Sequence, residues 1–345
     1  MTRDPSLRAL LAALGTVLVM STGAGVSAAP QPAAPAPPAP PAARGEITVD
    51  ALSVVKLRSR AVAGARTAPM LGTQREGTGV VIDGNGLVLT IGYLILEAES
   101  IELSTADGHS VPATVVAYDA ETGFGLVRAL GALPITPATF GDSTGVAARD
   151  PVFIVGFDGV APAYVVSRRR FVGYWEYLLN EAIYTAPATV NWAGAALLDR
   201  QRRLVGIGSL AVPDAIGPDS QVPGNLFVPI DHLKPLLADL IARGRSPAPP
   251  RPWLGVYTRE VEGNVIVTRV AEDGPADRAP LRIGDVIVAL GGQTIKDQAD
   301  FYQRIWRSGE PGREIPLDVL REGRIQRVTV KSIERDRYYR AKPTF

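Results

Sequence analysis

The strongest constraint on the fold is a series of short, apolar and often β-branched runs that alternate with Gly-rich turns. Residues 79–83 and 87–90 are two such runs, and Asp83-Gly84-Asn85-Gly86 joins them. Asn and Gly tolerate the backbone angles of a tight hairpin, so this segment predicts two antiparallel strands. Further runs of this kind are expected to form strands at 101–104, 111–118, 152–156, 163–167 and 204–210. So many short strands between residues 46 and 228 predict a mostly β architecture, either a barrel or a sandwich.

One segment has helical periodicity instead. Apolar residues at positions 233, 236, 237, 240 and 241 follow the i, i+3, i+4, i+7, i+8 spacing of a helix with one apolar face. Asp231 is its expected N-cap, and Gly244 is its expected C-terminal stop. Residues 245–252 then form a predicted linker, because closely spaced prolines neither continue a helix nor donate to a sheet.

The chain after the linker has the size of one small domain. Residues 264–270 and 324–331 alternate apolar and polar side chains, which predicts strands, and 298–306 is expected to be helical. We therefore expect one domain over residues 46–244 and a second over 253–345.

The N-terminus has the pattern of an export signal. Arg3 and Arg8 precede an apolar stretch at 9–20, and Val26-Ser27-Ala28 is a small-x-small cleavage site. Residues 1–28 are therefore a predicted signal peptide, with an uncleaved membrane anchor as the alternative, and 29–45 a Pro/Ala-rich tether. No later segment is long and apolar enough to cross a bilayer. The expected location is the periplasm, and secretion or retention by an uncleaved signal stay open.

Composition excludes several kinds of site. The chain has no cysteine, which excludes disulfides, thiolate catalysis and cysteine-ligated metal centres. It has only two histidines, so a histidine-rich metal site is also excluded. The formal net charge of +1 gives no electrostatic reason to expect nucleic acid as a partner. No cofactor and no metal are expected.

Several segments, taken in order along the chain, resemble one family. They are Gly77-Thr78-Gly79-Val80-Val81-Ile82-Asp83 with Gly86-Leu87-Val88-Leu89-Thr90, Asn225-Leu226-Phe227-Val228-Pro229-Ile230, Arg251-Pro252-Trp253-Leu254-Gly255-Val256, Gly274-Pro275-Ala276, and Leu281-Arg282-Ile283-Gly284-Asp285-Val286-Ile287. In this order they resemble the HtrA/Deg (DegP-like) family of exported serine proteases. The resemblance implies a trypsin-like double β-barrel at 46–244, followed by a PDZ domain, a β-sandwich with helices, at 253–345.

The activity of that family rests on a serine nucleophile, a histidine base and an aspartate that orients the histidine. The resemblance puts Tyr93 at the histidine position, Gly123 at the aspartate position and Ala193 at the nucleophile position. Alanine has no nucleophilic atom, glycine has no side chain, and a tyrosine with an ordinary pKa of about 10 is a poor base at neutral pH. The expectation is therefore a pseudoprotease without catalytic residues, not an enzyme.

The residues nearby provide no replacement for this triad. No lysine lies between Leu71 and Ile230, which excludes a Ser–Lys dyad in the barrels. His109 is expected in an exposed hairpin loop, and His232 near the start of the closing helix. Arg168-Arg169-Arg170 is interpreted as a solvated loop, with contact to an anionic partner or a lipid surface as the alternative. The aromatic residues that follow it are interpreted as a packed cluster, with a partner site as the alternative.

Four residues of the second domain are candidates for peptide binding. Trp253, Leu254, Gly255 and Val256 match the family's carboxylate-binding loop, which implies capture of extended C-terminal peptides. The helix near 299–305 is expected to form the opposite wall of the groove. The alternative is a strand start with a packing tryptophan.

These expectations combine into a binding function in the cell envelope. The chain is predicted to bind C-terminal or unfolded polypeptide through its PDZ domain, as a scaffold, adaptor or holdase in protein quality control. Two alternatives stay open: a regulatory subunit in a mixed oligomer with an active HtrA protease, and an active serine endopeptidase. Because family members are usually trimers, a homo-trimer is also considered.

Overall fold

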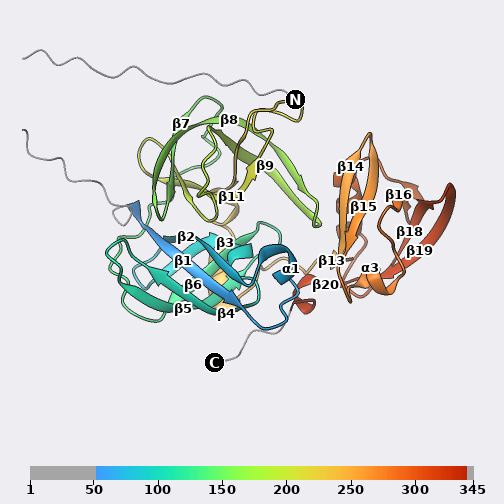
Figure 1. Cartoon of the computed structure of the whole chain (residues 1–345), viewed down its shortest axis with the longest axis horizontal. Helices are drawn as coiled ribbons and strands as arrows, with labels where there is room; N and C mark the ends of the chain where they lie inside the picture. The colour runs from blue at the N-terminus through green and yellow to red at the C-terminus, as the bar shows by residue number, and fades with distance from the viewer. Residues whose placement is uncertain (1–51, 340–345) are drawn as a thin grey trace, which may run out of the picture. The chain divides into compact units, whose positions relative to one another are not determined.

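The computed structural model describes residues 52–339. The predicted signal peptide (1–28) and tether (29–45) lie outside the described residues. Within the described part, strands dominate and form two closed barrels, a larger open sheet and a two-stranded pair (Figure 1). The mostly β class predicted from the alternating runs is confirmed. The predicted limits of the domains at 46–244 and 253–345 stay predictions.

The first barrel, coloured blue to cyan in Figure 1, closes in the order β1-β2-β3-β6-β5-β4. Its strands are β1 (Val54–Ala61), β2 (Gln74–Val81), β3 (Leu87–Ile91), β4 (Ala98–Ser104), β5 (Ser110–Tyr118) and β6 (Phe124–Ala129). Strand β3 pairs with β2 on one side and with β6 on the other, and all five of its residues are buried. The predicted turn before β3 forms as expected: the Asp83 carboxylate accepts hydrogen bonds from the amides of Asn85 and Leu87, at 2.8 Å each.

The second barrel, coloured green in Figure 1, closes in the order β10-β11-β12-β9-β8-β7. Its strands are β7 (Pro151–Gly156), β8 (Gly159–Gly173), β9 (Tyr177–Ala186), β10 (Ala196–Leu198), β11 (Leu204–Val212) and β12 (Gly224–Pro229). Strands β8 and β9 are the two longest strands of this barrel, and their register continues to Gly173 opposite Tyr177. Residues 174–176 therefore form the tip of a long hairpin.

The solvated loop expected for Arg168-Arg169-Arg170 is wrong, because these residues belong to β8. The Arg168 guanidinium donates hydrogen bonds to the carbonyl oxygens of Ser143 and Val146, at 2.7 and 2.8 Å. The Arg169 guanidinium lies 3.7 Å from the centre of the Tyr184 ring. Backbone carbonyls and an aromatic face thus hold two of the three arginines on the barrel.

The closing helix is shorter than its periodicity predicts. Helix α2 spans Leu237–Arg243, and a 3₁₀ turn, η3 (Ile230–His232), precedes it. The N-cap expected at Asp231 is wrong, because its carboxylate is bound by Ser143 and Lys234 and caps no helix. The expected stop is confirmed: Gly244 has φ 69° and its amide donates to the carbonyl of Leu240.

The C-terminal domain, coloured orange to red in Figure 1, is a sheet in the order β14-β15-β16-β18-β19 with two helices. Its elements are β14 (Val256–Val261), β15 (Asn264–Val270), α3 (Pro275–Arg278), β16 (Val286–Leu290), β17 (Gln293–Thr294), α4 (Gln298–Arg307), β18 (Glu314–Arg321) and β19 (Arg324–Lys331). Strand β14 is the end strand of this order, so one of its edges is not paired to another strand of the sheet. The strands predicted at 264–270 and 324–331 are confirmed.

Further short elements lie within the first barrel or beside the C-terminal domain. They are α1 (Ala68–Leu71), η2 (Gly92–Leu94), a two-stranded pair of β13 (Pro252–Trp253) with β20 (Ile333–Glu334), and η4 (Arg335–Arg337). The pair brings the end of the proline-rich linker beside β20, the last strand among residues 52–339. Among residues 52–339, no helix has the length and apolarity needed to span a membrane.

Candidate functional site

An apolar cavity of about 380 Å³ lies at the predicted triad positions Tyr93 and Gly123. Its walls come from both barrels and from the C-terminal domain. Among the lining residues are Tyr93, Gly123, Tyr177, Trp192, Ser209, Tyr257 and Tyr338. A cavity of this size, lined by many aromatic and aliphatic side chains and few charged groups, is typical of a binding site.

Tyr93 lies in η2 of the first barrel and spans the boundary between the barrels. Its hydroxyl donates a hydrogen bond to the carbonyl oxygen of Ser209, at 2.8 Å. Burial raises the pKa of the Tyr93 hydroxyl, and a hydrogen bond involving Trp192 only partly offsets that effect. The hydroxyl therefore stays protonated at neutral pH and serves here as a hydrogen-bond donor.

At the other two predicted triad positions, the backbone carbonyl groups accept hydrogen bonds from neighbouring segments. The carbonyl oxygen of Gly123 accepts a hydrogen bond from the amide of Gly92, at 2.7 Å, next to Tyr93. The carbonyl oxygen of Ala193, from the second barrel, accepts one from the amide of Thr78 in the first, at 2.8 Å. The structure thus brings Tyr93, Gly123 and Ala193 to the boundary between the barrels.

The two histidines lie away from this cavity. The His109 ring is exposed and its Nε2 lies 3.1 Å from the carbonyl oxygen of Ala132. The Nε2 atom of His232 lies 3.3 Å from the carbonyl oxygen of Asn180. The sequence contains no third histidine, so no imidazole lies at the position of Tyr93.

The loop predicted to bind carboxylates lies between β13 and β14. Trp253 belongs to β13, and Val256 is the first residue of β14. Gly255 has φ 76°, a left-handed conformation that favours glycine. This turn directs the amides of Leu254, Gly255 and Val256 toward one point.

That point is occupied by the side chain of Glu176 from the tip of the β8–β9 hairpin. The carboxylate of Glu176 accepts hydrogen bonds from the amides of Gly255 and Val256, at 2.7 and 2.9 Å, and from that of Leu254 at 3.2 Å. Glu176 is 2% exposed. The loop therefore binds a carboxylate in this structure, and the carboxylate comes from the same chain.

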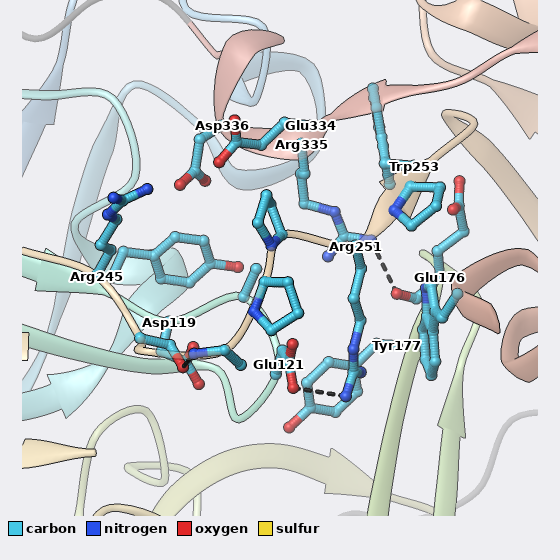
Figure 2. Close-up of a pocket in the computed structure, with 18 of the residues that line it drawn as sticks. Asp119, Glu121, Glu176, Tyr177, Arg245, Arg251, Trp253, Glu334, Arg335 and Asp336 are labelled. Atoms are coloured by element: carbon cyan, nitrogen blue, oxygen red, sulfur yellow. Dashed lines mark hydrogen bonds and ion pairs between the residues drawn. The ribbon is translucent and has the colours of Figure 1, made fainter. Parts of the chain in front are cut away.

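Arg335, in η4, faces Glu176 from the other side. Its guanidinium donates to the backbone carbonyl oxygens of Trp175 and Glu176, at 2.7 and 2.8 Å, and Figure 2 shows it beside Glu176 and Trp253. Burial raises the pKa of Glu176, while the positive charge of Arg335 and the three amides favour the carboxylate. Three backbone N–H groups donate hydrogen bonds to the Glu176 side chain and need acceptor oxygens, so the ionised carboxylate is the form that fits this site.

A smaller cavity of about 100 Å³ lies beside Glu176, under the proline-rich linker (Figure 2). Glu121 and Arg251 form an ion pair of 2.5 Å in its wall. Burial raises the pKa of Glu121, and the charge of Arg251 counters that effect. This ion pair attaches the linker to the first barrel.

Comparisons with known proteins agree with this architecture. Residues 77–207 match the trypsin-like peptidase domain family, and residues 252–332 match the PDZ domain family. A probable periplasmic serine endoprotease DegP-like of Brucella suis biovar 1 (strain 1330) is 26% identical over 291 residues, which cover 77% of this chain and 55% of that protein. The chain belongs to the HtrA/DegP family. Its fold, a trypsin-like domain followed by a PDZ domain, is the one predicted.

Two further comparisons extend the family relationship. The putative serine protease HhoA of Synechocystis sp. (strain ATCC 27184 / PCC 6803 / Kazusa) is 26% identical, over 75% of this chain and 71% of that protein. A solved structure of an HtrA-type protease AlgW variant with a tripeptide has a TM-score of 0.50 and 23% identity, and covers 85% of this chain and 95% of that one. The structural match concerns the fold alone. The chain spans about half the length of the Brucella relative.

The expectation that this HtrA/DegP-family chain is not an enzyme is contradicted by these relatives. The proteins from Brucella and Synechocystis are named as a serine endoprotease and a serine protease, and a further relative from Bacillus subtilis (strain 168) is named serine protease Do-like HtrA. The names point to protease activity. The prediction erred because it inferred the absence of all activity from three positions of this single chain.

Sequence reasoning missed Glu176 and Arg335. No role was assigned to either residue from the sequence. The packed aromatic cluster itself is confirmed: the rings of Trp175 and Tyr177 stack with their centres 5.4 Å apart. No local pattern marks Glu176 as a ligand of residues 254–256, since 78 to 80 positions separate these partners.

Proposed function

We propose that this HtrA/DegP-family protein serves proteolytic quality control in the cell envelope as a polypeptide-recognition subunit. Its PDZ domain binds C-terminal or unfolded segments of other proteins through Trp253, Leu254, Gly255 and Val256. The chain assembles with an active HtrA protease as a mixed trimer, and the assembly cleaves the bound polypeptide.

One observation carries the recognition part of this proposal. The amides of Leu254, Gly255 and Val256 converge on a single carboxylate. Hydrogen bonds to an ionised acceptor are among the strongest in proteins, and backbone capture of a terminal carboxylate is the recognised mode of PDZ domains. The edge of β14 beside this loop offers a place for an added strand.

Assembly with an active protease is supported by the names of the curated relatives, which are serine proteases. The periplasmic name of the Brucella relative supports the envelope as the place of action.

The test mixes the purified full chain with an active HtrA protease of the same organism and unfolded casein. Co-elution of the two proteins and a changed rate of casein cleavage are expected. A fluorescent decapeptide ending in Ala-Leu-Val with a free carboxylate should bind the chain, and the same peptide with an amidated end should bind at least tenfold more weakly. Separate elution, together with equal binding of the two peptides, would contradict the proposal.

A second function is favoured by the names of the curated relatives, which are serine proteases. In this alternative the chain cleaves polypeptide by itself, with a nucleophile other than Ala193. Casein cleavage by the chain alone, blocked by a serine-directed fluorophosphonate, would favour it over the subunit function. Peptide mapping of the labelled chain would identify the nucleophile.

A further inference from the structure

The tip of the β8–β9 hairpin occupies the PDZ domain in the way a peptide ligand would. Thr258, in β14, donates its amide hydrogen to the carbonyl oxygen of Tyr174, at 2.9 Å. Val256 comes two residues before Thr258 in β14, and its amide donates a hydrogen bond to the carboxylate of Glu176. Glu176 comes two residues after Tyr174 in the hairpin. The backbone contact of residue 174 with 258 and the side-chain contact of residue 176 with 256 run in opposite chain directions. The segment therefore passes the free edge of β14 in the antiparallel sense.

Helix α4 closes the other side of this segment. Gln298, the first residue of α4, directs its side-chain amide nitrogen to the carbonyl oxygen of Thr258, at 2.8 Å, and lies 3.5 Å from that of Gly173. Residues 173–176 thus begin between the end strand of the sheet and the start of the helix. Strand addition at a sheet edge, with a carboxylate held by backbone amides, is how PDZ domains bind peptides.

The hairpin tip is held in this position from the barrel side as well. The ring of Trp175 stacks on Tyr177 and meets the edge of Tyr174, whose ring centre is 4.8 Å away. Glu176 has φ 53°, a left-handed conformation that is uncommon for residues other than glycine. Arg335 binds the two carbonyl oxygens of Trp175 and Glu176. These contacts present the side chain of Glu176, in place of a chain end, to the carboxylate-binding loop.

We propose that residues 173–176 are an internal ligand of the PDZ domain, with the Glu176 carboxylate in the place of a peptide's terminal carboxylate. A peptide must displace this segment before it binds. The inference rests on the proposed recognition function. Since the apparent affinity of a site falls with the fraction of molecules in the competent state, the segment lowers the affinity for every peptide with a free C-terminus.

The variant Glu176→Gln tests this inference. It keeps the shape of the side chain but removes the charge and one acceptor oxygen, which weakens its bonds to the three amides. The matched control is Glu181→Gln, which removes an equal charge from the exposed side of the same hairpin, where Glu181 lies 3.6 Å from Arg168. Glu176→Asp, which shortens the side chain by one methylene group, is a second test if the glutamine variant folds poorly.

Two measurements separate the internal ligand from the proposed function. Hydrogen exchange at the amides of residues 254–258 should be at least tenfold faster in Glu176→Gln than in the unmodified chain, and unchanged in Glu181→Gln. The decapeptide ending in Ala-Leu-Val with a free carboxylate should bind Glu176→Gln at least tenfold more tightly than the unmodified chain.

The outcomes distinguish failure of the internal-ligand proposal from failure of the proposed peptide recognition. Equal exchange rates in Glu176→Gln and the unmodified chain, or equal and measurable peptide affinities, would overturn the internal ligand. Faster exchange in Glu176→Gln without peptide binding by either protein would support the internal ligand and overturn peptide recognition as the function of the PDZ domain.

Discussion

Asp231 accepts hydrogen bonds from the backbone amide and from the hydroxyl of Ser143. Both bonds reach the same carboxylate oxygen, at 2.5 Å each. Ser143 lies in the connection between the barrels and is fully buried, and Asp231 lies in η3, after the last strand of the second barrel. The ammonium group of Lys234 binds the other carboxylate oxygen. This contact fastens the connection to the end of the barrel region.

The stability of the protein should depend on the ionisation of Asp231. Burial opposes ionisation, but the hydrogen bonds from Lys234 and Ser143 outweigh it and lower the pKa of Asp231 from 3.8 to about 2. A lowered pKa stabilises the folded state above the unfolded value of 3.8, and this contribution is lost as pH falls from there toward 2. Asp231→Asn should cost about 1 to 2 kcal/mol at pH 6, and much less at pH 2.5.

Urea unfolding of both proteins across this pH range measures the difference. Asp239→Asn is the control, since Asp239 pairs with the exposed Arg243 at 3.3 Å and should contribute below about 0.5 kcal/mol. A loss in Asp231→Asn that stays constant from pH 6 to pH 2.5 would contradict the argument.

Gly194 should be sensitive to any side chain. It has φ 74°, and a Cβ atom there would lie 2.1 Å from the backbone carbonyl oxygen of Thr78, on the other barrel. Backbone cannot yield as a flexible side chain does, so Gly194→Ala should cost about 3 kcal/mol or more in urea unfolding. Gly84→Ala, where a Cβ meets open space, should cost less than about 1 kcal/mol. Equal losses of stability in the two variants would contradict this argument, because they would mean that the backbone at Thr78 moves away from residue 194 at little cost in free energy.

The buried ion pair of Asp285 and Arg321 should contribute far more to the stability of the fold than the exposed ion pair of Asp318 and Arg327. The guanidinium of Arg321 donates to both oxygens of Asp285, at 2.7 Å each, and Asp285 is 1% exposed. Asp285→Asn leaves the guanidinium charge without its buried partner, at a cost of about 3 kcal/mol. Asp318→Asn removes a similar two-bond contact to the exposed Arg327 and should cost below about 1 kcal/mol. Thermal unfolding would rule out the argument if both variants lost the same stability.

Tyr93→Phe should weaken the boundary between the barrels. The change removes the donor to the carbonyl oxygen of Ser209, which is 2.8 Å away, and leaves that buried oxygen without this bond. We expect a loss of about 1 to 2 kcal/mol in urea unfolding. Tyr164→Phe on β8, where the ring is exposed, should be neutral within about 0.5 kcal/mol. A neutral Tyr93→Phe would mean that water replaces the hydroxyl.

Local chemistry explains the features that were predicted correctly from the sequence. The Asp83-Gly84-Asn85-Gly86 turn forms because its bonds run between residues only two to four positions apart. The predicted strand at 264–270 matches β15, because its apolar and polar side chains alternate between the two faces of a strand. The left-handed stop at Gly244 also follows from a property of one residue.

The errors arose where distant groups compete for the same residue. Asp231 has the composition of an N-cap, yet Ser143, 88 positions earlier, takes its carboxylate. The charges of Arg168 and Arg169 suggest a solvated loop, yet backbone carbonyls and the Tyr184 ring receive them within a strand. The triad position predicted at Tyr93 rests on a motif, but its contact with Ser209 depends on packing across the barrels.

The sequence by itself determined the alternating strands, the turns, the order of the two domains and the residue types at Tyr93, Gly123 and Ala193. These depend on properties of neighbouring residues and on motifs read in order along the chain. Only the tertiary structure decided that the carboxylate-binding loop meets Glu176. That contact joins two segments about 80 residues apart, and it exists because the barrel holds a long hairpin against the edge of β14. Its energy comes from a buried charge and three amides, which no local pattern brings together.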